Sequence, residues 1–273
     1  MDFAVSRGRH RRRYPAAFLT GGAVGIVGGL IGLGGAEYRL PLLMGVFGFP
    51  PLEAVIVNKA LSLVVVSVAL PARAASVPWS MVSSYRGVVV NLLAGSLLGA
   101  WLGADWATRL RSATLSKVIA VLLLGIAGVL LLAHDASSGG GLPEGPVRWM
   151  LGLLAGTGIG AVAAVLGVAG GELLIPTLVL LFGEETRLAG SLSLVVSLPT
   201  MVVAFSRYSR DRSFGVLRTN WRFLAAMAAG SVAGAVVGGR LVGVVPSAAL
   251  LPTLAVLLAW SAIRLWRHRP PEH

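Results

Sequence analysis

The segment Gly32-Leu33-Gly34-Gly35-Ala36-Glu37 returns later in the chain as Gly167-Val168-Ala169-Gly170-Gly171-Glu172, an offset of 135 residues. The same offset relates many other positions without a gap, among them Gly21 and Gly156, Pro41 and Pro176, Ala54 and Ala189, and Ser62 and Ser197. A repeat of this length indicates that one structural unit occurs twice. We therefore expect two homologous halves.

The composition indicates a membrane protein. Of the 273 residues, 56% are hydrophobic and only 12% are charged, whereas soluble domains carry about 25% charged residues. Several apolar runs approach the roughly 20 residues needed to span hydrocarbon. We predict an all-α integral membrane protein with eight long spans, near 15–35, 53–72, 87–107, 114–133, 148–169, 188–206, 219–239 and 248–266, and two short segments, near 38–50 and 173–183.

The repeat also predicts the domain boundaries. A basic cytoplasmic N-terminus (1–14) precedes the first transmembrane repeat (15–134), and a linker (135–147), a second repeat (148–267) and a cytoplasmic tail (268–273) follow. The linker is rich in serine and glycine, which is typical of flexible connections. The first span follows a basic cluster, as in a signal peptide, but it belongs to the repeat, so we expect it to be retained.

The basic residues predict orientation rather than nucleic-acid binding. The net charge is +12, but the charges form short clusters between apolar spans, and loops rich in Lys and Arg stay in the cytoplasm. Equivalent loops of the two halves carry unequal numbers of basic residues, and the more basic loop lies in the first half, then in the second, then in the first again. The pairs, first half before second, are Arg7, Arg9, Arg11, Arg12 and Arg13 against Arg148; Arg73 and Arg86 against Arg207, Arg210, Arg212, Arg218 and Arg222; and Arg109, Arg111 and Lys117 against Arg240. We expect inverted halves with five crossings each; the alternative is eight spans in parallel halves with re-entrant short segments.

The glycine motifs predict broken helices. Glycine clusters let a helix end and restart, and Pro41 and Pro176 are predicted to mark these breaks. A broken helix exposes N–H groups that attract an anion, so Gly34, Gly35, Gly170 and Gly171 are candidate substrate-binding residues. Close helix packing is the alternative role for small residues, and we predict it for Gly95, Gly99, Gly103, Gly230, Gly234 and Gly238.

Glu37 and Glu172 occupy equivalent positions directly after the two motifs. One interpretation is that each carboxylate stabilises the N-terminus of the following helix. The other is that they couple transport to protons or act as gates, since acids inside a membrane are costly. Both interpretations stay open at this stage.

Polar residues in the second long span are the next candidates. Asn58 and Ser62 lie one helical turn apart on one face, beside Lys59, and the equivalent stretch carries Ser193 and Ser197. Such groups could replace the water around an oxyanion, and Lys59 could offset its charge. Alternatively, Lys59 reaches the membrane interface and the hydroxyl and amide groups join neighbouring helices.

Enzymatic chemistry finds little support. The chain has no cysteine, and its four histidines lie near the termini or the linker, so the spans offer no thiolate or histidine cluster for catalysis or for a metal. No phosphate-binding loop of the Walker type occurs either. We expect no cofactor and no bound metal.

These motifs resemble the sulfite exporter TauE/SafE family of membrane permeases. The resemblance covers roughly residues 16–266 and rests on Gly25-x-x-Gly28-Gly29-x-x-Gly32-x-Gly34-Gly35, followed by Pro41 and the span from Ala54, and on the recurrence of this pattern from Gly160. It implies a secondary carrier for sulfite, sulfonates or other small organosulfur anions.

The leading hypothesis is a permease of the cytoplasmic membrane that moves a small anion by alternating access. The expected partners are the anion and the lipid bilayer; a homodimer is a candidate assembly, and nucleic acid is not expected. A passive anion channel is the alternative, and a membrane-embedded enzyme is a weaker one.

Overall fold

The computed structural model describes residues 3–31, 35–74, 84–133, 141–240, 259, 262–263 and 266. Within this part of the chain every regular element is helical. The elements are α1 (Phe3–Ile31), α2 (Ala36–Gly45), α3 (Pro51–Ala74), α5 (Arg86–Arg109), α6 (Ser112–Ala133), α7 (Pro146–Leu166), α8 (Gly171–Phe182), α9 (Thr186–Tyr208), the 3-10 turn η1 (Arg212–Gly215), α10 (Val216–Thr219) and α11 (Trp221–Arg240).

Six described helices are long and apolar enough to cross a membrane: α3, α5, α6, α7, α9 and α11. The all-helical prediction is thus confirmed, and each of these helices coincides with a predicted span. The described apolar part of the predicted first span, 15–35, is the shorter stretch Tyr14–Gly29 of α1, and the predicted last span, 248–266, lies largely outside the described residues. The count of eight spans therefore stays a prediction.

The two short predicted segments are separate helices. The ten residues of α2 and the twelve of α8 correspond to about 15 and 18 Å at 1.5 Å per residue. The hydrocarbon core is about 30 Å thick. Both short helices are therefore shorter than the hydrocarbon core, and five crossings in each half stays a prediction.

Glycine stripes bring two pairs of helices into backbone contact. A Cβ on Gly95, Gly99 or Gly103 of α5 would collide with the backbone of α7, and one on Gly230, Gly234 or Gly238 of α11 would collide with the backbone of α1. The packing role predicted for these six glycines is confirmed. Removing the side chain lets helices approach closely, which is a common way of joining them inside a membrane.

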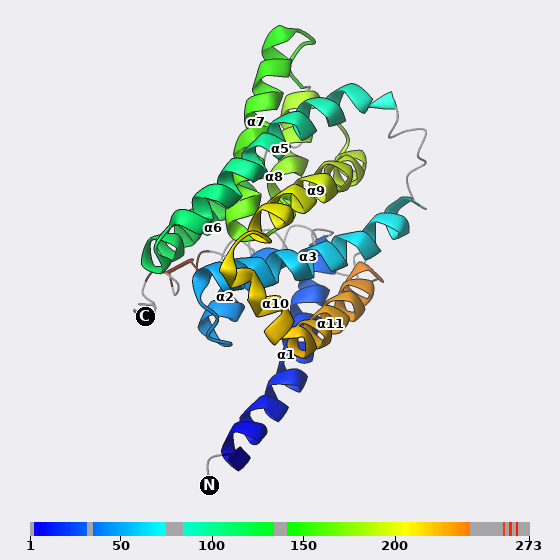
Figure 1. The fold of residues 1–273 in the computed structure, drawn as a ribbon. Helices are drawn as coiled ribbons and strands as arrows, with labels where there is room; N and C mark the ends of the chain where they lie inside the picture. Colours follow the sequence, from blue (N-terminus) through cyan, green and yellow to red (C-terminus); the bar gives the residue numbers. More distant parts are fainter. Residues whose placement is uncertain are drawn as a thin grey trace.

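The direction of both helix pairs follows from the contacts. Gly95, Gly99 and Gly103 meet Leu153, Thr157 and Ala161 in that order, so α5 and α7 run parallel. The contacts of α11 with α1 advance in the same way. Figure 1 shows α1 at the bottom, next to the N-terminus, and α7 at the top, so that the two helices approach the middle from opposite ends.

The centre of the molecule is formed by α3 and α9. Of their membrane-spanning residues, 61% and 67% are buried, against 33–50% in the other four long helices. The two helices contact each other directly. The polar residues predicted for the site lie on these two helices and on α2 and α8, which pack beside them.

Candidate functional site

Non-helical turns occur at both glycine motifs. In the second motif, α7 ends at Gly167 (φ 68°) and α8 begins after Gly170 (φ 83°). In the first, α2 begins after Gly35 (φ 68°), while Gly34 lies outside the described residues. These positive φ angles favour glycine because a Cβ destabilises the left-handed conformation.

The two prolines do not mark the breaks, and this corrects the prediction. Pro41 and Pro176 each occupy the sixth position of a helix, α2 and α8 respectively. A proline has no N–H to donate to the carbonyl four residues earlier. Those carbonyls belong to Glu37 and Glu172, so each proline leaves the backbone oxygen of an acidic residue without its usual helical donor.

Lys59 binds the end of α7. Its Nζ donates to the backbone O of Ala163 at 2.8 Å and of Val168 at 2.6 Å. The side chain is 0% exposed, so the alternative that Lys59 reaches the membrane interface is wrong. Its charge lies at the C-terminus of a helix, where the helix dipole favours a cation.

Asn58 connects both breaks. Its Nδ2 donates to the backbone O of Leu166, the last residue of α7, at 3.1 Å and to that of Ala36, the first residue of α2, at 3.0 Å. One buried amide of α3 thus contacts the glycine-motif region of each half. This cross-connection joins the halves at the positions where their helices are interrupted.

Two hydroxyl groups complete the contacts at the end of α7. Ser62 Oγ donates to Gly167 O at 3.4 Å, and Tyr208 Oη of α9 donates to Ala164 O at 2.9 Å. The last carbonyls of a helix lack intrahelical donors. Here side chains from α3 and α9 supply them in a fully buried setting.

The carboxyl groups of Glu37 and Glu172 meet at the first turns of α2 and α8. They interact electrostatically with each other, and Glu172 also interacts with Lys59. Both residues are at most 3% exposed. Within the described part of the chain, neither carboxyl oxygen of Glu172 has a hydrogen-bond partner other than Glu37.

Arg39 is a fourth charged residue that the sequence analysis did not single out. It is fully buried in α2 and interacts electrostatically with Glu37. When all four groups are ionised, the formal charges of Glu37, Glu172, Lys59 and Arg39 sum to zero. The repeat offset places leucine, Leu174 and Leu194, at the positions that correspond to Arg39 and Lys59. Both cations thus come from the first half, and each half supplies one acid.

The predicted serines of α9 are buried but differ in their bonding. Ser193 Oγ donates to Gly190 O of its own helix at 2.9 Å. Ser197 Oγ is buried and has no partner among the described residues. Ala169 of the second break packs in one apolar cluster with Val66 of α3 and Met201 of α9, so both central helices flank this break.

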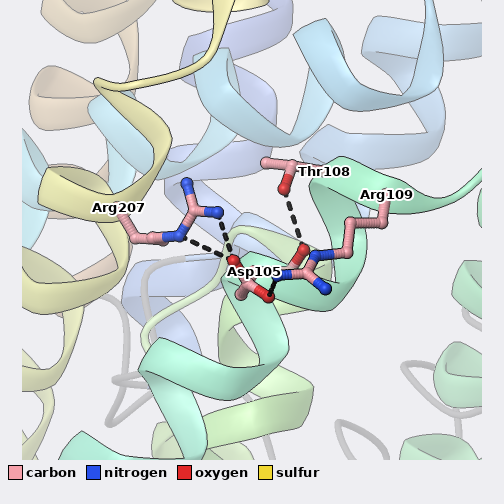
Figure 2. Close-up of polar contacts among 4 residues, drawn as sticks. All are labelled: Asp105, Thr108, Arg109 and Arg207. Atoms are coloured by element: carbon pink, nitrogen blue, oxygen red, sulfur yellow. Dashed lines mark hydrogen bonds and ion pairs between the residues drawn. The ribbon is translucent and has the colours of Figure 1, made fainter.

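A second charged cluster lies at the end of α5. Asp105 accepts from Nε of Arg207 at 3.0 Å and also from Nη2 of that residue, while Arg109 Nη2 lies 2.7 Å from its other oxygen. Figure 2 shows the two arginines converging on the carboxylate, with Thr108 bonded to the backbone oxygen of Asp105 at 2.8 Å. Arg207, predicted as a topology charge, thus also joins α9 to α5.

A pocket of about 130 Å³ lies away from the breaks. Its lining residues are Tyr14, Phe47, Phe49, Thr219, Asn220, Trp221, Arg222 and Phe223. None of them was predicted to bind substrate. The candidate site at the breaks is instead closed, since its charged and polar side chains are almost completely buried.

Comparison with known protein families gives a match over nearly the whole chain. The family model described as "Sulfite exporter TauE/SafE" matches residues 16–265. The comparisons with curated proteins and with solved structures found no match.

Proposed function

Because the chain belongs to the sulfite exporter TauE/SafE family, a family of membrane transporters and not of enzymes, we propose that it is a secondary transporter of the cytoplasmic membrane. Its substrate is a small anion: sulfite, a sulfonate or another organosulfur anion. The family and the apolar helices make it a multi-pass membrane protein. The identity of the anion, the location in the cytoplasmic membrane and the transport mechanism are our proposal.

The proposed mechanism is alternating access by two inverted halves. The offset of 135 residues makes α7 the counterpart of α1 and α5 the counterpart of α11. The parallel pair α1–α11 of the structure thus corresponds to the parallel pair α7–α5. The approach of α1 and α7 from opposite ends (Figure 1) supports inversion. Inverted halves are common in secondary transporters, where one half rocks against the other around a central site.

The observation that carries the proposal is the contact of Asn58 with Leu166 of one half and Ala36 of the other. A site at this point changes its exposure when the halves move. We expect the anion to replace some of these contacts and to bind the N–H groups of Gly35, Gly170 and Gly171. The side chains of Asn58, Lys59, Ser62, Ser193 and Ser197 complete the expected set of ligands.

Charge balance suggests proton coupling. With all four buried groups ionised their formal charges sum to zero, so in that state an entering anion leaves a net negative charge in a region shielded from water. Uncompensated charge is costly there. Protonation of Glu37 or Glu172 restores neutrality, and the proposed carrier therefore moves one proton with each singly charged anion.

Counterflow in proteoliposomes tests the function. Vesicles loaded with unlabelled sulfite, thiosulfate, sulfate or an alkanesulfonate are diluted into the labelled anion. A carrier accumulates label transiently and saturates with substrate concentration, whereas a channel does neither. Saturable counterflow of a sulfur anion supports the proposal. Linear uptake without counterflow favours the channel, and no flux of any tested anion contradicts both.

A further inference from the structure

We propose that the Lys59 ammonium is a tethered cation that fills a monovalent-cation site built by the end of α7. Removing the Lys59 side chain should open this site to a free monovalent cation. The proposed binding of a free cation to this site depends only on the structure. The consequence for transport, that the carrier needs no sodium ion, rests on the proposed function.

The geometry around Lys59 is that of a cation site. Its two bonded acceptors are backbone carbonyls, Ala163 O at 2.8 Å and Val168 O at 2.6 Å. They lie on either side of the turn at Gly167, so that one oxygen comes from the helix and the other from the non-helical segment. Carbonyls at unwound helix ends are the groups that coordinate Na⁺ in transporters built from broken helices.

The surrounding charge also favours a cation. The C-terminus of α7 contributes the negative end of its helix dipole, and Glu172 interacts electrostatically with Lys59. Further carbonyls of the same turn, Leu166 O and Gly167 O, face donors from Asn58 and Ser62. The turn therefore presents several oxygens toward α3, and Lys59 supplies a formal positive charge that bonds to two of them, Ala163 O and Val168 O.

A tethered ammonium changes what the site requires. A free ion loses its hydration shell and its translational freedom when it binds, whereas Lys59 is delivered by α3 as the protein folds. The position equivalent to Lys59 in the second half is Leu194. The built-in cation thus serves one break only, and Leu194 offers a matched control for loss of bulk without loss of charge.

The test compares purified Lys59→Ala, Lys59→Met and Leu194→Ala proteins with the wild type. Thermal unfolding is measured in choline chloride and after replacement of choline by Na⁺, K⁺ or methylammonium at constant ionic strength. For Lys59→Ala we expect the midpoint to rise saturably, by about 5 °C at a cation concentration of about 100 times Kd. Lys59→Met fills the site with an apolar chain and should not respond, like Leu194→Ala and the wild type.

Two results overturn the proposal. One is that no cation raises the unfolding midpoint of Lys59→Ala by more than it raises the midpoint of Leu194→Ala. The other is that the unfolding midpoint or the anion flux of the wild type depends on Na⁺. If Lys59→Ala does not fold, the wild type measured with and without Na⁺ tests the proposal by itself. Absence of sulfur-anion flux in the wild type would contradict the proposed function but would leave the binding result intact.

Discussion

Glu37 and Glu172 interact with each other although they are equivalent residues, 135 positions apart, in the two halves of the chain. A residue can meet its own counterpart only near the axis that relates two similar halves. In the proposed arrangement of two inverted halves, the carboxyl pair therefore lies close to that axis. Rocking of the halves would change its surroundings most directly, and this makes it a suitable place for coupling.

The first prediction concerns this pair. Glu37→Gln and Glu172→Gln keep the side-chain volume but remove an ionisable group, so each variant should lose the acceleration of anion flux by a proton gradient in the same direction. Counterflow without a gradient should persist. Initial rates in proteoliposomes, with and without the gradient, measure this. Glu185→Gln, a change at an exposed acid between α8 and α9, is the control, and an unchanged gradient response in both site variants contradicts coupling.

The second prediction concerns Asn58. In Asn58→Ala, the buried Leu166 O loses its side-chain donor, and an unsatisfied buried group costs about 1–3 kcal/mol. The free energy of unfolding in detergent should fall by about this amount. Ser193→Ala is the control, because that hydroxyl bonds only within its own helix among the described residues and its removal should cost clearly less. Equal losses in the two variants would argue against a bridging role for Asn58.

The third prediction concerns the turn at Gly167. An alanine there adopts a left-handed conformation, which costs about 1–2 kcal/mol, and its Cβ meets Val55 O of α3. Gly167→Ala should therefore lower both the unfolding midpoint and the transport rate. Gly128→Ala in α6 is the control, since its Cβ meets nothing within 4 Å. A Gly167→Ala protein as stable and active as this control would show that the turn tolerates a side chain.

The fourth prediction concerns Asp105 and Arg207. Their side chains are 24% and 18% exposed, so the pair is only partly shielded from water. A double-mutant cycle with Asp105→Asn and Arg207→Gln should give a coupling energy of about 0.5–1 kcal/mol. High salt should reduce it. The control is the same cycle with Arg109→Gln in place of Arg207→Gln, and we expect a weaker coupling between Asp105 and Arg109, which both lie in α5. A coupling energy near zero between Asp105 and Arg207 would contradict the role of Arg207 in joining α9 to α5.

Much of the fold could be predicted because it depends on local sequence. Long apolar runs predict helices such as α5 and α9, because the transfer of apolar side chains from water to lipid is favourable. The glycines at 167 and 170 define the turn through their backbone freedom, and Gly99 and Gly234 mark close packing because they lack a side chain. Pro41 and Pro176 misled the prediction, because a proline near a break in sequence need not form the break.

The site could be predicted only in part. The sequence singled out Glu37, Lys59 and Asn58 as polar residues in apolar segments, but it left two interpretations of each. It missed the burial of Arg39 and the pairing of Asp105 with Arg207. These properties depend on side chains that meet across more than one helix, and no spacing within a single segment reports such a meeting.

The sequence by itself determined that this protein is a repeated, helical membrane chain with interruptions at its glycine motifs, because hydrophobicity and backbone freedom act on neighbouring residues. Only the tertiary structure decided that Lys59 of the first half binds the end of α7 in the second. That contact is set by the docking of α3 against a turn more than a hundred residues away, where bare carbonyls excluded from water require a donor.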